Sequence, residues 1–184
     1  MSTSEDLRRA IAMETANRAA FLAFAERAEA HGMPQVARLF RAVAESEAVH
    51  ARRESQLLSD LPGEQASPAP LEAAAAPQVG STVENLKRAV AAEEREFQDL
   101  YARFLREAQG RGDHRAARVW GQILKVERGH RRLFYDALVA VLDGEDAPAS
   151  SVFVCRACGN TVVGEPQDDC SVCAAPADGF TDVP

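Results

Sequence analysis

The sequence predicts a mainly helical protein: a four-helix bundle with a long crossover between its second and third helices, followed by a small C-terminal metal-knuckle domain. Four long segments carry apolar residues at spacings of three, four and seven, the pattern of amphipathic helices. A stretch rich in Pro and Ala separates these segments into two pairs, and all four cysteines lie between positions 155 and 173. At 184 residues the chain can form one sizeable core and a small appendage.

The first helix pair is expected over residues 5–30 and 35–59, with His31-Gly32 as the break between them. The apolar stripe of the first helix contains Leu7, Ile11, Glu14, Phe21 and Ala25. The stripe of the second contains Val36, Phe40, Val43, Glu47, His50 and Leu57. Because glutamates interrupt both apolar faces, we expect their side chains to point into the bundle.

The second helix pair follows a stretch from Pro62 to Gly80 that is too long for a tight turn and predicts a crossover connection. Ser81 or Thr82 can cap the third helix, which should continue to Gly110. Its stripe contains Val83, Leu86, Val90, Glu93, Phe97, Leu100 and Phe104. The fourth helix is expected from about 113 to 142, and its stripe contains Val119, Ile123, Glu127, His130, Phe134 and Leu138.

The polar residues on these stripes repeat between the two pairs. Each pair supplies a lone glutamate and then a Glu-x-x-His motif, with 33 residues from Glu14 to Glu47 and 34 from Glu93 to Glu127. A buried carboxylate is costly without a cation, and carboxylates with imidazole but no thiolate suit iron or manganese. The pattern therefore predicts a two-metal site that suits a pair of iron ions. Glu47 and Glu127 are placed to bridge the ions, and each histidine can bind one of them.

The two halves differ at one position that matters for the chemistry. Glu96 follows Glu93 by three residues, whereas the equivalent residue after Glu14 is Asn17. Glu96 is therefore a seventh candidate ligand on one side only. Glu54 is expected to be a solvated ion-pair partner of nearby arginines, and Trp120 to be ordinary core packing.

The cysteines form two Cys-x-x-Cys pairs, Cys155/Cys158 and Cys170/Cys173, which predict a tetrahedral four-thiolate metal site. Zinc would make this site structural, and iron would make it a one-electron relay. Coupling to a redox-active carboxylate site favours iron. Short β-like pieces at 152–154 and 161–163 surround the site, and the predicted domains are residues 1–145 and 146–184.

Composition excludes several classes of partner. The net charge is −7, without a basic cluster, so neither nucleic acid nor an anionic membrane is expected as a partner. The chain contains no membrane-length apolar stretch, and its first residues contain no apolar run typical of a secretory signal. These features predict a cytoplasmic protein.

Several segments together resemble the rubrerythrin family, in which a ferritin-like di-iron bundle precedes a rubredoxin-like iron domain. They are MET at 13–15, ESEAVHA at 45–51, AEEREFQDLY at 92–101, VERGH at 126–130, and the CRACGN and CSVCAAP knuckles. The resemblance implies seven di-iron ligands: Glu14, Glu47, His50, Glu93, Glu96, Glu127 and His130. It also implies that Glu96 and His50 alternate as ligands of one iron, and Tyr101 matches a family tyrosine.

Three positions depart from the family pattern. Phe21 stands where the family usually has a tyrosine near the di-iron site. Asn160 replaces the aromatic residue that commonly follows the first knuckle, and Ser171 replaces a proline after the third cysteine. All four thiolates are retained.

The resemblance implies a non-haem peroxidase that reduces hydrogen peroxide to water in oxidative-stress defence, with Glu96, His50 and Tyr101 at the reacting site. It implies two irons in the carboxylate site and one in the four-cysteine site. No nucleotide-binding motif is present, so electrons should come from rubredoxin or an NAD(P)H-dependent reductase. A head-to-tail homodimer is expected, with one subunit's small domain serving the other's di-iron site. The alternatives are a ferroxidase or iron-handling protein, and an interaction module stabilised by a zinc ribbon.

Overall fold

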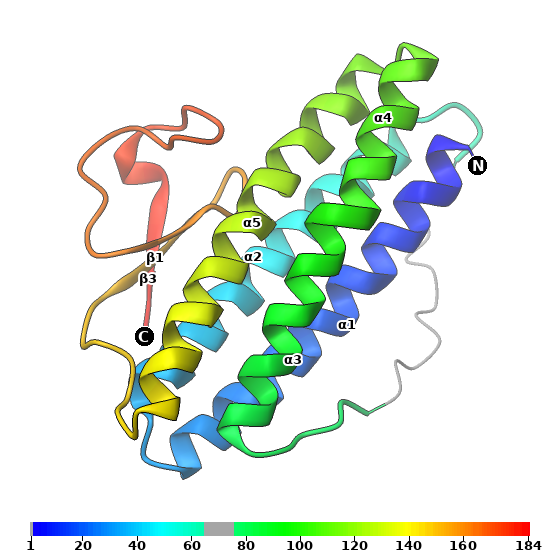
Figure 1. Cartoon of the computed structure of the whole chain (residues 1–184). Helices are drawn as coiled ribbons and strands as arrows, with labels where there is room; N and C mark the ends of the chain where they lie inside the picture. The colour runs from blue at the N-terminus through cyan, green and yellow to red at the C-terminus, as the bar shows by residue number, and fades with distance from the viewer. Residues whose placement is uncertain (1, 65–75) are drawn as a thin grey trace.

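The computed structural model describes residues 2–64 and 76–184, which form a long helical bundle with a small β-sheet against its side (Figure 1). The helices are α1 (Thr3–Ala30), α2 (Pro34–Ser59), α3 (Thr82–Arg95), a π-helical turn (Glu96–Leu100), α4 (Tyr101–Arg111) and α5 (His114–Leu142). The predicted four-helix bundle is confirmed, because α3, the π turn and α4 form one helical run. The centre of the predicted crossover, 65–75, lies outside the described residues. No described helix is long and apolar enough to cross a membrane.

Local capping explains where the helices begin. Ser2 and Glu5 form a capping box at the start of α1, and Ser81 and Glu84 form another at the start of α3. The Asp113 carboxylate accepts a hydrogen bond from the backbone N–H of Ala116 at the start of α5. Each cap satisfies a backbone donor that the first turn leaves unpaired.

The π-helical turn at Glu96–Leu100 was not predicted from the sequence. Because of this turn, the prediction that Phe97 and Leu100 lie on the core-facing stripe is wrong. An unbroken α-helix would bring Leu100 to the core face seven residues after Glu93. The wider turn holds one extra residue, which rotates the rest of the helix. Tyr101 is therefore fully buried, whereas Phe97 and Leu100 are only half-buried.

Two apolar cores flank a polar layer in the middle of the bundle. One core contains Phe21 and Phe134, whose ring centroids are 5.2 Å apart. The other contains Phe104 and Trp120, whose centroids are 5.1 Å apart. The glutamates and histidines of the two repeated motifs lie between these cores, so apolar packing holds the layer from both ends.

The small sheet has the strand order β2-β1-β3, formed by β1 (Val152–Cys155), β2 (Thr161–Val163) and β3 (Phe180–Val183). The first two strands confirm the predicted β-like pieces, but β3 was not predicted. The sheet packs on α2 through Ala42. The Asp146 carboxylate accepts hydrogen bonds from the backbone N–H groups of Gln35 and Val36, at 2.8 and 3.1 Å. The linker is therefore bonded to the start of α2 in its own chain.

Candidate metal centre

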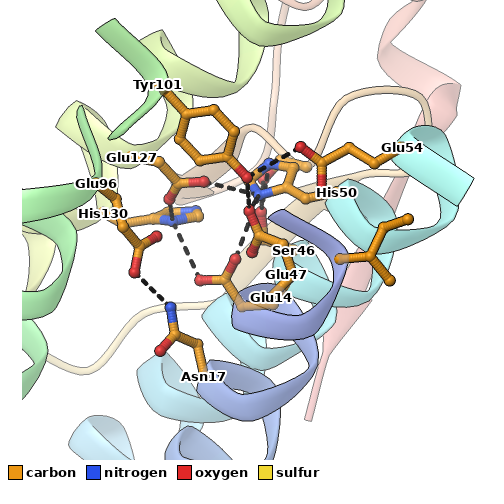
Figure 2. Close-up of polar contacts among 12 residues, drawn as sticks. Glu14, Asn17, Ser46, Glu47, His50, Glu54, Glu96, Tyr101, Glu127 and His130 are labelled. Atoms are coloured by element: carbon orange, nitrogen blue, oxygen red, sulfur yellow. Dashed lines mark hydrogen bonds and ion pairs between the residues drawn. The ribbon is translucent and has the colours of Figure 1, made fainter. Parts of the chain in front are cut away.

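The seven predicted ligand residues converge in the middle of the bundle, and Figure 2 labels all of them except Glu93. Each of the four helical segments of the bundle supplies at least one of these residues, and each residue is at most 1% exposed. The residues are Glu14 on α1, Glu47 and His50 on α2, Glu93 on α3, Glu96 on the π turn, and Glu127 and His130 on α5. The inward orientation that helical periodicity predicted is confirmed for the four glutamates and two histidines of the apolar stripes. Glu96, a candidate because it follows Glu93 by three residues, is buried as well.

Six of the seven residues form two overlapping groups, each compact enough to surround one ion. Ligand atoms of Glu14, Glu47, His50 and Glu127 all lie within 4.8 Å of one another, and so do those of Glu47, Glu93, Glu127 and His130. Because Glu47 and Glu127 belong to both groups, their carboxylates can bridge two ions. His50 and His130 each belong to one group, as the sequence predicted.

Glu96 stands outside both groups, although it is buried. The Asn17 side-chain amide donates a hydrogen bond to Glu96 Oε1 at 2.5 Å. Asn17 therefore holds the seventh candidate ligand at the edge of the cluster. Asn17 and Glu96 occupy equivalent positions in the two halves of the repeat, and their side chains contact each other.

The donor set fits a pair of iron ions. Among the described residues, Glu14 Oε2, both carboxylate oxygens of Glu93 and Glu96 Oε2 are buried without a hydrogen-bond partner. A buried carboxylate oxygen is costly unless a hydrogen bond or a cation compensates it. Carboxylate and imidazole ligands without thiolate suit iron, and two cations balance most of the charge of the glutamates.

Without metal, protons must take the place of these cations. Burial, followed by the neighbouring carboxylates, raises the pKa of Glu47, Glu93 and Glu96. Burial acts to lower the pKa of His50, but Glu127 and Glu14 outweigh it and raise that pKa well above its usual value. Burial also acts to raise the pKa of Glu127, yet the two histidines hold it below its usual value. His50 Nδ1 lies 2.8 Å from Glu127 Oε1.

These pKa shifts predict that the metal-free chain loses stability as pH rises. In the folded chain, Glu47, Glu93 and Glu96 keep their protons at pH values where the same carboxyls in the unfolded chain, with an ordinary pKa of 4.5, have lost them. His50 acts in the same direction above its ordinary pKa of 6.5, whereas the stability from Glu127 is lost only under acid conditions. The free energy of unfolding should therefore fall between about pH 5 and 8. Thermal melts of the metal-free chain should show a Tm several degrees lower at about pH 8 than at about pH 5. An equal fall of Tm with pH in the metal-loaded chain would contradict this cause.

Tyr101 and two further residues form a hydrogen-bonded group beside Glu14. The Tyr101 hydroxyl donates to Glu14 Oε1 and also lies 3.1 Å from Glu54 Oε1. The Trp120 indole N–H donates to the same Glu54 oxygen at 3.0 Å. Glu54 is fully buried, so its expected role as a solvated ion-pair partner is wrong, and Trp120 does more than pack. Glu54 follows His50 by one helical turn, and this spacing is the sequence signal that could have placed Glu54 at the site.

The four cysteines converge as predicted. Their Sγ atoms all lie within 4.8 Å of one another, with 3.7 Å between Cys155 and Cys173 and 3.6 Å between Cys158 and Cys170. None forms a disulfide. Burial raises the pKa of the Cys158 thiol, so a bound cation is what would keep it as a thiolate. The arrangement fits one tetrahedral ion.

The first cysteine knuckle lies directly against the histidines of the bundle. The Cys158 carbonyl is 3.2 Å from His50 Nε2, and the Ser46 hydroxyl donates to the Gly159 carbonyl at 2.7 Å. His130 Nε2 lies 3.0 Å from the Thr161 hydroxyl. Both histidines therefore turn one ring nitrogen to the carboxylates and the other to the small domain. Sequence reasoning missed Ser46 and Thr161, because their roles depend on two segments that meet only in the folded chain.

A cavity of about 350 Å³ opens on the other side of the bundle, between α1 and α3. Its lining includes Asn17, Phe21, Arg88 and Arg95. Because Asn17 also bonds Glu96, the cavity wall is connected to the carboxylate cluster by one side chain.

Comparison with known proteins places this centre in a family. The rubrerythrin family model matches residues 5–138. Nigerythrin from Nitratidesulfovibrio vulgaris is 34% identical over 98% of this chain and 86% of its own length, and rubrerythrin from Porphyromonas gingivalis is 34% identical over 95% and 86%. A structure of fully reduced, all-ferrous nigerythrin matches with a TM-score of 0.87 at 33% identity, covering 99% of this chain and 87% of that one. The likeness spans both the bundle and the cysteine knuckles, and the chain belongs to the rubrerythrin family, whose members bind non-haem iron.

Proposed function

We propose that the chain is a di-iron peroxidase that reduces hydrogen peroxide to water, protects against oxidative stress and receives electrons through its four-cysteine centre. Rubrerythrin family members are oxidoreductases, generally of the peroxidase type. The observation that carries the proposal is the contact between the Cys158 carbonyl and His50 Nε2. It joins the four-cysteine site to a carboxylate site that fits two irons.

The reaction needs two electrons and two protons for each peroxide, because H₂O₂ + 2e⁻ + 2H⁺ gives two water molecules. A pair of ferrous ions, when bound, would supply the two electrons and two positive charges for the separating oxygens. The Glu47 and Glu127 carboxylates, which belong to both ligand groups, would hold the two ions. Figure 2 shows His50 and Glu96 on different sides of the cluster. In this proposal they would exchange as ligands of one ion, as the resemblance implies. Tyr101 directs a hydrogen bond at Glu14.

Electrons and substrate have separate routes in this proposal. The small domain lies beside α2 and α5 (Figure 1). The cavity, by contrast, is lined by residues of α1 and α3. Electrons would pass from the Cys158 knuckle to His50. Peroxide, which is small and neutral, would enter on the side of Asn17 and Glu96. The separation supports a site that meets its oxidant and its reductant from different directions.

The external electron donor is proposed to be rubredoxin or an NAD(P)H-dependent reductase. A ferroxidase remains the second candidate, because the same cluster of buried carboxylates could oxidise ferrous ions and release them. Anaerobic peroxide consumption tests the two. A peroxidase turns over repeatedly when a protein donor is supplied without free ferrous iron, whereas a ferroxidase consumes peroxide only in proportion to ferrous iron added. A zinc-ribbon interaction module leaves the buried carboxylates unexplained.

Mixed assemblies test whether electrons stay within one chain. A Glu127→Ala chain would lack a working carboxylate site, and a Cys158→Ala chain would lack the relay. Because the contact joins two sites of one chain, we expect co-assembled variants to stay as inactive as each variant alone in multiple-turnover peroxide reduction. Recovered turnover in well-mixed assemblies would contradict this expectation and would show transfer between subunits, the route that the resemblance implies. The homodimer itself stays a prediction.

Substitution of Gly159 tests the contact itself. Gly159 has a φ of +84°, and a Cβ there would lie 2.6 Å from His50 Nε2 and would also collide with the Ser46 hydroxyl. Gly164 also has a φ of +84° but has nothing within 4 Å of its Cβ position, so Gly164→Ala is the matched control for backbone strain. We expect Gly159→Ala to slow multiple-turnover peroxide reduction by about tenfold relative to Gly164→Ala, as loss of an outer-shell contact does. Equal rates in the two variants would argue against electron transfer through this contact.

A further inference from the structure

Glu54 is a buried carboxyl that is not among the seven candidate ligands. It lies on α2 with no solvent exposure. Its Oε1 atom is 3.0 Å from Trp120 Nε1 and 3.1 Å from the Tyr101 hydroxyl, whereas Oε2 has no hydrogen-bond partner among the described residues. An apolar side chain would fill this place without an unpartnered polar atom. The hydrogen bonds with Trp120 and Tyr101 therefore explain why a carboxyl lies at this buried position.

The donors and acceptors that these side chains carry determine the direction of each hydrogen bond. The Tyr101 hydroxyl has one hydrogen but lies within reach of two carboxyls, Glu14 and Glu54, so it can donate to only one of them at a time. The Trp120 N–H can only donate, and it already donates to Glu54 Oε1. Because the phenol has a single hydrogen, hydrogen bonds to both carboxyls require one of them to carry a proton. Glu14 is a candidate metal ligand, so the proton falls to Glu54, which can donate it to the phenol oxygen, and burial raises the pKa of Glu54. The Tyr101 hydrogen then remains available to Glu14.

We propose that Glu54 is a positioning residue: anchored by the Trp120 indole, it fixes the Tyr101 hydroxyl so that its hydrogen points at Glu14 and the metal centre. Figure 2 shows Tyr101 between the Glu54 and Glu14 carboxyls. The role deepens the proposed function and rests on it, because Tyr101 is the one phenol at the centre of the described cluster. It assigns a task to three residues, on α2, α4 and α5, that do not bind the ions themselves.

Three variants and one control separate positioning from packing. Glu54→Leu removes both hydrogen bonds. Glu54→Gln keeps an oxygen that can accept from the Trp120 N–H but carries no proton for the phenol oxygen, because both partners contact the same atom of Glu54. Trp120→Phe removes the anchor and leaves the carboxyl. Glu45→Leu places the same side chain at an exposed position of the same helix. Iron content and Tm are measured for every variant, so that loss of folding or of metal is recognised.

The first readout is spectroscopic and does not depend on catalysis. The chain has one tryptophan and two tyrosines, and Tyr135 is 46% exposed, so its hydroxyl hydrogen exchanges quickly with water. In the zinc-loaded full chain, which is diamagnetic, NMR should show one indole N–H signal and one protected tyrosine hydroxyl signal. Both should move or exchange faster in Glu54→Leu, whereas in Glu54→Gln the indole signal should persist and the tyrosine hydroxyl signal should move. A Tyr101 hydroxyl that stays protected in Glu54→Leu would overturn the positioning role.

The second readout is the division between kcat and KM for hydrogen peroxide in the iron-loaded chain. We expect Glu54→Leu to lower kcat by about tenfold or more with little change in KM, Glu54→Gln to lower it as well, and Trp120→Phe to lower it less. A kcat in Glu54→Leu equal to that in Glu45→Leu would overturn the proposal. If the unaltered chain has no peroxide turnover, the proposed function fails, and the Tyr101 signal still decides whether Glu54 positions the hydroxyl.

Discussion

Glu127→Ala is expected to abolish peroxide reduction and to remove both ions from the carboxylate site. Glu127 belongs to both ligand groups, and its carboxylate lies 2.8 Å from His50 Nδ1 and 2.9 Å from His130 Nδ1. Its loss takes a bridging ligand from each ion and leaves both histidines without their nearest carboxylate. Turnover should fall by about 1,000-fold or more, beyond the roughly 10–100-fold cost of losing an outer-shell partner.

Iron content per chain and peroxide consumption measure this effect together. The four-cysteine site shares no ligand with the bundle, so its iron and its visible band should remain in Glu127→Ala. Glu45→Ala, an exposed glutamate of α2, is the matched control and should retain both activity and metal. A Glu127→Ala chain that keeps its full iron content and turnover would contradict the assignment of Glu127 as a bridging ligand.

Cys158→Ala should separate the chemistry from the supply of electrons. Cys158 supplies one of the four thiolates and also the carbonyl that contacts His50. We expect multiple-turnover reduction by a protein donor to fall by about 100-fold or more, because a structural metal site holds the small domain together and a three-thiolate site binds its ion poorly. A chain reduced chemically beforehand should still reduce about one peroxide, because the pair of irons supplies both electrons.

The comparison of single and multiple turnovers is the measurement for this variant. Stopped-flow mixing of the reduced chain with peroxide gives the single turnover, and donor oxidation gives the steady state. Loss of both together would show that the small domain is needed to form the carboxylate site. A steady state equal to that of the unaltered chain would show that electrons enter by another route.

Periodicity made the bundle and most of its site predictable. Inward-facing glutamates at positions 14, 47, 93 and 127 break apolar stripes, and the two histidines follow their glutamates by three residues. Such signals are local, since each depends only on the angle between successive residues of one helix. The cysteine pairs were equally readable, because a knuckle is formed within a few residues.

Features that depend on contact between distant segments could not be predicted in the same way. The π turn changes the helical period over five residues, and no single residue type there distinguishes it from an α-helix. Glu54 looked like a surface residue because its partners, Tyr101 and Trp120, come from other helices. The contacts of the first knuckle with Ser46 and His50 require the linker to bring the small domain back along α2.

Peroxide-driven reoxidation of the four-cysteine iron tests the central claim most directly. The iron-loaded chain is reduced with dithionite, freed of excess reductant and mixed with hydrogen peroxide in the absence of oxygen, while the visible thiolate-to-iron band is followed. We predict about three irons per chain and a red band that is bleached by reduction and restored by peroxide. A colourless chain with about one zinc, or a band that peroxide does not restore, would contradict the account.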